Sequence, residues 1–81
     1  MIKVLKYVVS KENIPILFDT NILHSDVLVH VLSAGFVIIS YDKKINKFSA
    51  KCYGESSTLK IGSKENDNLI IEEFFNTKIV A

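Results

Sequence analysis

The sequence contains no arginine, and all ten of its basic side chains belong to lysine. The planar guanidinium group of arginine is the group that most often reads guanine edges and grips phosphate through two parallel hydrogen bonds. The formal net charge is only +1, so the chain as a whole has little electrostatic attraction for nucleic acid. Both observations argue against a dedicated nucleic-acid reader.

Cysteine is almost absent too, because Cys52 stands alone and has no partner for an internal disulfide. No apolar run approaches the roughly 18 residues that a membrane-spanning helix requires. The N-terminal segment MIKVLKYVVSKEN is interrupted by Lys3 and Lys6, and no small-residue cleavage site follows it, as it would in a signal peptide. We therefore expect a cytoplasmic protein without a membrane span.

Apolar residues, by contrast, are plentiful for a chain of 81 residues: they make up 48% of it, and the mean hydropathy is +0.25. We expect one domain over residues 1–81. A domain of this size buries only about 60% of the surface that its unfolded chain exposes. The apolar content therefore favours a homo-oligomer, while a compact monomer with one exposed apolar patch is the alternative.

Hydrophobic periodicity predicts strands over residues 3–10, 14–19 and 35–42. In the last of these, GFVIISYD, both faces are apolar, so it is expected to be a central strand or one covered on both sides. The segment SDVLVHVLSAG over 25–35 predicts a short helix, with Ser25 as its cap and Gly35 as its end. Its three valines favour a strand instead, so helix or strand over 25–32 stays open.

The stretch CYGESSTLKIGSKEND, residues 52–67, predicts a β-hairpin with a two-residue turn at Gly54 and Glu55. In the preceding strand, 45–53, Phe48, Ala50 and Cys52 are expected to face inward. The turn would set Ala50 opposite Leu59 and Phe48 opposite Ile61, and a shift of one residue would destroy this match.

Ser63 is expected to cap a second helix over residues 64–75. The order β-β-α-β-β-β-α then indicates an α+β domain, with a small antiparallel sheet of about five strands and two helices. Whether the C-terminal tail, residues 76–81, pairs in the sheet is left open.

No residue pattern assembles a catalytic set, so the protein is not expected to be an enzyme or to hold a cofactor. ILFDTN, which contains Asp19 followed by two more polar residues, resembles the opening of PIN-type nucleases over six residues only, and a turn-forming aspartate is the better interpretation. His24 and His30 are six residues apart, which is not the spacing of a helical metal pair, so no metal site is predicted. Cys52 is expected to be a small core residue rather than a nucleophile.

One polar surface could bind a ligand. The outer face of the predicted hairpin, over 47–60, is rich in lysine and hydroxyl groups, and the free backbone donors at a helix start favour anions. The residues predicted to bind a small anionic or nucleotide-like ligand are Lys51, Tyr53, Ser56, Thr58, Lys60, Ser63 and His24. The alternative is a solvated sheet face, whose lysines protect an edge from aggregation.

Three segments resemble a family of small uncharacterised bacterial and prophage proteins. They are SAGF, which begins at Ser33, YGxSxTLxIxSK, from Tyr53 to Lys64, and the His-x-Asp element of His24 and Asp26. Glu65 and Asn66 stand where members of that family carry proline and glutamate. The resemblance implies a phage or mobile-element setting and no particular activity.

From these observations we expect a non-enzymatic interaction protein that self-associates and binds a protein partner, such as host machinery. The alternative is a binder of a small anionic ligand.

Overall fold

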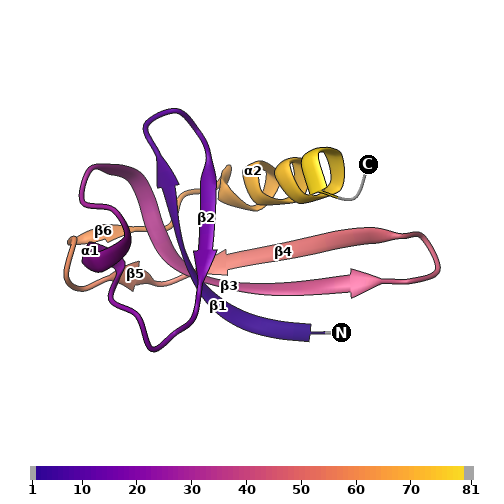
Figure 1. Cartoon of the computed structure of the whole chain (residues 1–81), viewed down its shortest axis with the longest axis horizontal. Coiled ribbons are helices and arrows are strands. Elements are labelled where there is room, and N and C mark those ends of the chain that lie inside the picture. Colours follow the sequence, from indigo (N-terminus) through magenta and orange to yellow (C-terminus); the bar gives the residue numbers. More distant parts are fainter. Residues whose placement is uncertain (1, 80–81) are drawn as a thin grey trace.

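The computed structural model describes residues 2–79, with the side chains of residues 2–77, and it is an α+β structure as the sequence predicts. Figure 1 shows the arrangement of the elements. The elements are β1 (Ile2–Ser10), β2 (Pro15–Phe18), α1 (His24–Val27), β3 (Val31–Asp42), β4 (Lys47–Tyr53), β5 (Glu55–Ser56), β6 (Ile61–Gly62), α2 (Asp67–Glu73) and the π-helical segment η1 (Phe74–Ile79).

Four strands form one antiparallel sheet in the order β2-β1-β3-β4, and β5 pairs with β6 in a separate two-stranded sheet. β1 and β3 pair along almost their whole length, from Ile2 opposite Ser40 to Ser10 opposite Val31. The β3–β4 hairpin extends away from the rest of the chain, and the molecule is 38 Å long in this direction (Figure 1).

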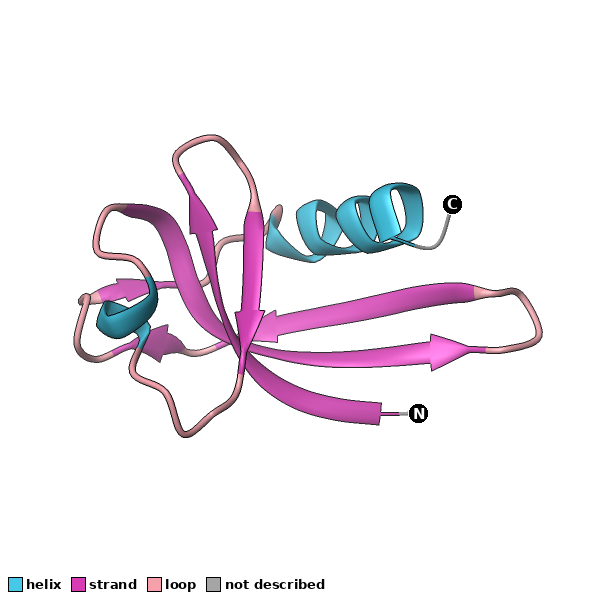
Figure 2. Cartoon of the chain, viewed as in Figure 1, coloured by secondary structure: helices cyan, strands magenta, loops and turns pink. Residues whose placement is uncertain are grey.

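The core has two parts, one on each face of the sheet. Helix α2 and η1 cover one face (Figure 2), where Ile71 and Phe75 pack with a cluster that contains Tyr7 and Val37. On the other face, α1 and the β5–β6 segment cover only the end of the sheet around Val8 and Ala34. Strand periodicity explains this division, because alternate residues of β1, β3 and β4 point to opposite faces. Phe48, Ala50 and Cys52 face α2, so their predicted inward orientation is confirmed.

The predicted helix over 25–35 is wrong in its extent. Helix α1 is a single turn that ends at Val27, and β3 begins at Val31. Val31 to Gly35 pair with β1 instead, so long-range pairing and the β-branched valines prevail over the local capping signals. Gly35 does not end a helix: it lies within β3, where a Cβ atom would stand 2.6 Å from the carbonyl oxygen of Tyr53.

The predicted 47–60 hairpin is also wrong. β4 pairs with β3, with Phe36 opposite Tyr53, while β5 and β6 pair with each other. Gly54 has the expected positive φ, +74°, but there the chain leaves the large sheet rather than folding back along β4. The second edge of β4 is occupied by α2, so the strand has no place for residues 56–61.

Ser63 does not cap the second helix. Asn66 occupies the N-cap position, and α2 begins at Asp67. The tail does not pair in the sheet over residues 76–79, because η1 continues the helix to Ile79. Val80 and Ala81 lie outside the described residues.

Candidate functional site

The seven predicted ligand-binding residues do not share one surface. Lys51 and Tyr53 are exposed on β4, on the sheet face away from α2, whereas Lys60 and Thr58 are exposed in the turn between β5 and β6. Ser56 is completely buried: its hydroxyl oxygen accepts a hydrogen bond from the backbone N–H of Leu59 at 3.1 Å and lies 3.3 Å from the Thr58 hydroxyl. It stabilises that turn rather than facing a ligand.

His24 is buried between α1 and the sheet. Its Nε2 atom lies 2.9 Å from the carbonyl oxygen of Gly35, so the tautomer with a proton on Nε2 donates this hydrogen bond. The rings of Phe18 and Phe36 lie edge-on to the imidazole, with centroid distances of 5.5 and 5.9 Å. These contacts attach α1 to β3, and they enclose the imidazole within the fold.

The backbone donors just before α2 are bonded within the fold, one of them to the side chain of Asp67. The carboxylate of Asp67 accepts a hydrogen bond from the backbone N–H of Lys64 at 2.8 Å, and the N–H of Ser63 donates to the carbonyl oxygen of Gly54 at 3.0 Å. The helix proper has seven residues. An acidic group therefore takes the position that the sequence suggested for an anion.

A polar cluster lies beneath the start of α2. Asp67 is 2% exposed, and its carboxylate accepts hydrogen bonds from the hydroxyl groups of Tyr7 and Ser33, the latter at 2.9 Å. Burial, followed by the hydrogen bond to Asp67, raises the pKa of Tyr7 above its usual value. Burial also raises the pKa of the nearby Cys52 thiol to about 11.

This cluster joins the helix to the sheet rather than forming a catalytic centre. A neutral phenol, a neutral thiol and a carboxylate with three donors include no activated nucleophile. The sequence analysis did not predict this cluster. The sequence contains no signal for the pairing of Asp67 with Tyr7, which lies 60 residues away.

Two open depressions flank α2 near the β1–β2 turn. Their volumes are about 330 and 610 Å³, and they share Asn13, Asn66 and Ile70. The smaller one reaches Ser33 and Asp67, but these two side chains are bonded to each other.

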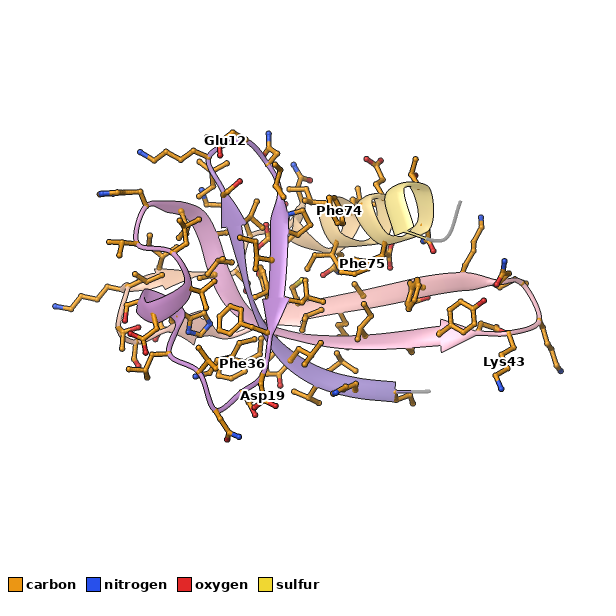
Figure 3. All side chains as sticks on the ribbon, in the orientation of Figure 1. Glu12, Asp19, Phe36, Lys43, Phe74 and Phe75 are labelled. Atoms are coloured by element: carbon orange, nitrogen blue, oxygen red, sulfur yellow. The ribbon has the colours of Figure 1, made fainter. Side chains whose placement is uncertain are left out.

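The most distinctive surface is the side of the large sheet away from α2, beyond the end that α1 and the β5–β6 segment cover. We call it the open face. Its residues come from three neighbouring strands: Ile2, Val4 and Lys6 of β1, Phe36, Ile38 and Ser40 of β3, and Lys47, Ser49, Lys51 and Tyr53 of β4. Figure 3 shows Phe36 on the side of the sheet away from α2, whereas Phe75 lies between α2 and the strands.

The side chains of the open face form cross-strand rows. Val4, Ile38 and Lys51 make one row, and Lys6, Phe36 and Tyr53 make the next. The rings of Phe36 and Tyr53 are stacked with a centroid distance of 5.7 Å, and the Lys6 ammonium lies 6.0 Å from the centre of the Phe36 ring. Each row thus combines apolar or aromatic area with a lysine at its end.

Charge is distributed unevenly along the molecule. Residues 2–6 and 36–53, which form the open face and the hairpin, contain six of the ten lysines and one of the nine acidic residues, Asp42. This part therefore carries a formal charge of 6 − 1 = +5, and the rest of the chain carries 4 − 8 = −4. Figure 3 shows Lys43 at the tip of the hairpin, far from Glu12 in the β1–β2 turn. Of these lysines, Lys6, Lys47 and Lys51 lie on the open face, which holds no acidic residue, so this surface is basic although the whole chain is nearly neutral.

Comparison with known proteins gives no match, either to a protein-family model, to a curated protein or to a solved structure. Within residues 2–79, no group of three or more His, Cys, Asp and Glu side chains is placed to hold a metal ion. No helix in the same part of the chain has the length and apolar character needed to cross a membrane.

Proposed function

We propose that the protein is a non-enzymatic interaction module that binds an acidic protein partner through the open face. The observation that supports this is the concentration of lysine and uncovered apolar side chains on one sheet face. Ile2 is 76% exposed, Val4 46% and Tyr53 43%. An aromatic residue among apolar neighbours with charged groups around them is typical of protein interfaces.

A protein partner fits this surface better than a nucleic acid. The open face itself holds three lysines, Lys6, Lys47 and Lys51, and no arginine. Strong binding to a phosphate backbone uses more cationic contacts than this, and exposed isoleucine and valine contribute little to it. Carboxylates beside apolar side chains match both components of the face.

The biological origin of the protein bears on the identity of the partner. The resemblance described above supports a phage or mobile-element origin, and the partner would then be a protein of the host. Self-association, which the apolar composition favours, would use the same exposed residues, so it is measured separately from binding to another protein.

A small anionic or nucleotide-like ligand is the second candidate. It is supported only by Lys51 and Tyr53, which are neighbours on the open face, since Ser56 and His24 have partners within the fold. Such a ligand would stack on Tyr53 with its anionic group near Lys51.

The test is a selection from a displayed library of random peptides against the immobilised protein. The double variant Lys47→Glu/Lys51→Glu reverses the charge of the open face, and Lys11→Glu/Lys64→Glu makes the same change of net charge at two exposed lysines elsewhere. We expect the selected peptides to be enriched in acidic and apolar residues. They should bind the first variant about 10-fold more weakly than the second, because two lost charge contacts of up to about 1 kcal/mol each give an effect of this order.

Equal binding to the two variants, or no enrichment in acidic residues, would show that the open face does not bind an acidic partner. Tighter binding of an oligothymidylate than of every selected peptide would assign the surface to nucleic acid instead. Sedimentation of the unliganded protein at concentrations from micromolar to millimolar separates self-association from binding to another protein. A dimer that is abolished by Lys47→Glu/Lys51→Glu would make the open face a contact between copies.

A further inference from the structure

The edges of the large sheet differ in how they are protected. Along β4, three backbone N–H groups donate to α2 and η1 side chains: Phe48 to Asn76 at 2.7 Å, Ala50 to Glu72 at 2.8 Å and Cys52 to Asn68 at 2.7 Å. The acceptors are spaced by four residues, so they lie along one side of the helix. This edge has no free donors at these positions and cannot accept another strand there.

The opposite edge is formed by two strands. β2 covers β1 only from Lys6 to Val9, and it is a strand of four residues that begins with Pro15, which has no N–H to offer. β1 extends four residues further, and Ile2–Leu5 pair with β3 on one side only. Figure 1 shows this N-terminal half of β1 running past the end of β2 along β3.

The backbone groups of this free segment point outward at Ile2 and Val4. In an antiparallel ladder, the N–H and C=O of alternate residues point to opposite neighbours. The N–H of Ser10 donates to Ile14 across the β1–β2 turn, and Pro15 stands opposite Val9, so the even-numbered residues of β1 are turned toward β2. Beyond the end of β2, Ile2 and Val4 continue this alternation and present their donors and acceptors to solvent.

The side chains around the free segment define the partner. Ile2 and Val4 belong to the open face, so a strand added beside them would extend that face by one strand. Lys3 lies on the face of the sheet opposite Ile2 and Val4, whereas the ammonium group of Lys6, on the open face, already donates to the carbonyl oxygen of Ile22 at 2.8 Å. An extended segment that alternates acidic and apolar residues can therefore place its acidic side chains beside Lys3 and its apolar side chains beside Ile2 and Val4.

A second copy of this chain fits the same edge poorly. An antiparallel pairing of two copies that joins the outward-pointing residues sets Ile2 opposite Val4 and Lys3 opposite Lys3. Like charges directly opposite each other destabilise a strand pair. Shifting the strands so that Val4 faces Val4 would bring Ile2 to Lys6, where Phe18 of β2 already lies.

From these observations we propose that the free edge of β1, Ile2–Leu5, accepts an extended acidic–apolar segment of the partner protein as a fifth strand of the large sheet. This inference rests on the proposed function, because the added strand would be the part of the acidic partner that lies beside the open face. Main-chain hydrogen bonds to Ile2 and Val4 would provide affinity, and Lys3 would provide the preference for acidic residues.

The probe is a synthetic peptide of seven residues that alternates glutamate and valine, with both ends blocked. It is titrated into the ¹⁵N-labelled protein while the hydrogen exchange of the Val4 amide is measured. We expect amide shifts at Ile2 to Leu5 and exchange at Val4 slowed at least about 10-fold at saturation, since that amide gains a hydrogen bond. A peptide in which lysine replaces glutamate serves as the control and should bind at least about 10-fold more weakly.

The variant Val4→Pro removes the outward-pointing N–H donor but no backbone hydrogen bond to β3. It should therefore fold but no longer bind the glutamate–valine peptide. Should this variant fail to fold, the exchange measurement on the unmodified chain decides by itself.

Three results would overturn the edge proposal. Amide shifts confined to Lys47, Lys51 and Tyr53, with unchanged exchange at Val4, would leave the open face as the binding surface and exclude strand addition. If the glutamate–valine peptide does not bind at millimolar concentration while the selected acidic peptides still bind the open face, strand addition at β1 is also excluded. Protection of Val4 that disappears on dilution of the unliganded protein would assign the edge to a second copy.

Discussion

The hydroxyl group of Tyr7 in β1 donates a hydrogen bond to the carboxylate of Asp67 at the start of α2, 60 residues further along the chain. Both residues are buried, and the same carboxylate also accepts hydrogen bonds from the Ser33 hydroxyl and the Lys64 backbone N–H. These hydrogen bonds attach α2 to the two central strands of the sheet, β1 and β3. It follows that the helix and its contacts with the β4 edge depend on this cluster.

Replacing Tyr7 by phenylalanine should lower the free energy of unfolding by about 1 to 3 kcal/mol, because the buried carboxylate of Asp67 loses one of its donors. Urea unfolding followed by circular dichroism measures the change. Tyr53→Phe is the matched control, since Tyr53 is exposed and the change should cost less than about 0.5 kcal/mol. Equal effects of the two substitutions would show that the Tyr7 hydroxyl does not stabilise the fold.

The pKa shift of Cys52 predicts slow chemistry at its thiol. Burial raises the pKa from the usual 9.0 to about 11, so the thiolate population near neutral pH falls by about 100-fold. Alkylation by iodoacetamide at pH 8 should therefore be at least about 100-fold slower in the folded protein than in urea. A rate in the folded protein equal to that in urea would contradict the partly buried position of the thiol.

The same shifts predict the direction of alkaline unfolding. The neutral forms of Cys52 and Tyr7 are favoured in the folded state, so their contribution to stability is complete below the unfolded pKa of the thiol, 9.0. It should be lost as pH rises, from 9.0 to about 11 for Cys52 and above 10.0 for Tyr7. The urea midpoint should fall as the pH rises from 8 to 11. Above pH 10 the midpoint of Tyr7→Phe should fall less steeply than that of the unmodified protein.

The local pattern predicts the strands well because burial alternates along them. The inward positions Phe48, Ala50 and Cys52 follow from a period of two residues, and the strand 35–42 follows from its run of apolar residues on both faces. The helix over 25–35 failed because its cap signals are local, whereas pairing with β1 is not. Residues 25–35 are compatible with a helix and with a strand, and pairing with β1 makes residues 31–35 a strand.

The hairpin over 47–60 failed for a related reason. Ala50 opposite Leu59 and Phe48 opposite Ile61 form a consistent pattern, yet β4 uses one edge for β3 and the other for α2. Competition between partners that are distant in sequence cannot be read from the pattern of one segment. The open face was missed for the same reason: its rows combine residues from β1, β3 and β4, which become neighbours only after the sheet forms.

Removing the acceptor of Glu72 should expose the β4 edge. Glu72→Ala leaves the partly buried N–H of Ala50 without a partner, so we expect a loss of about 1 to 2 kcal/mol of stability and a greater tendency to self-associate through β4. Glu73→Ala is the matched control, because the exposed Glu73 lies one position further along the same helix. Unfolding in urea and light scattering at increasing concentration report the two effects. An unchanged scattering profile for Glu72→Ala would show that α2 does not protect this edge.

Gly35 tests whether close packing between β3 and the end of β4 determines the geometry of the open face. A Cβ atom there would meet the carbonyl oxygen of Tyr53 at 2.6 Å, and that atom belongs to the backbone of the neighbouring strand, so it cannot turn aside as a side chain would. Gly35→Ala should therefore cost about 1 to 3 kcal/mol of stability.

The matched substitution is Gly62→Ala, whose nearest atoms lie at an ordinary 3.6 Å, and it should change stability by less than about 1 kcal/mol. Gly35 also carries the carbonyl group that bonds His24, and it directly precedes Phe36, whose ring stacks on Tyr53. A shift of the β3 backbone would thus move α1 and the aromatic row of the open face together. Amide chemical shifts of the Gly35→Ala variant should change at His24, Phe36 and Tyr53, and changes confined to Gly35 and its two chain neighbours would contradict this coupling.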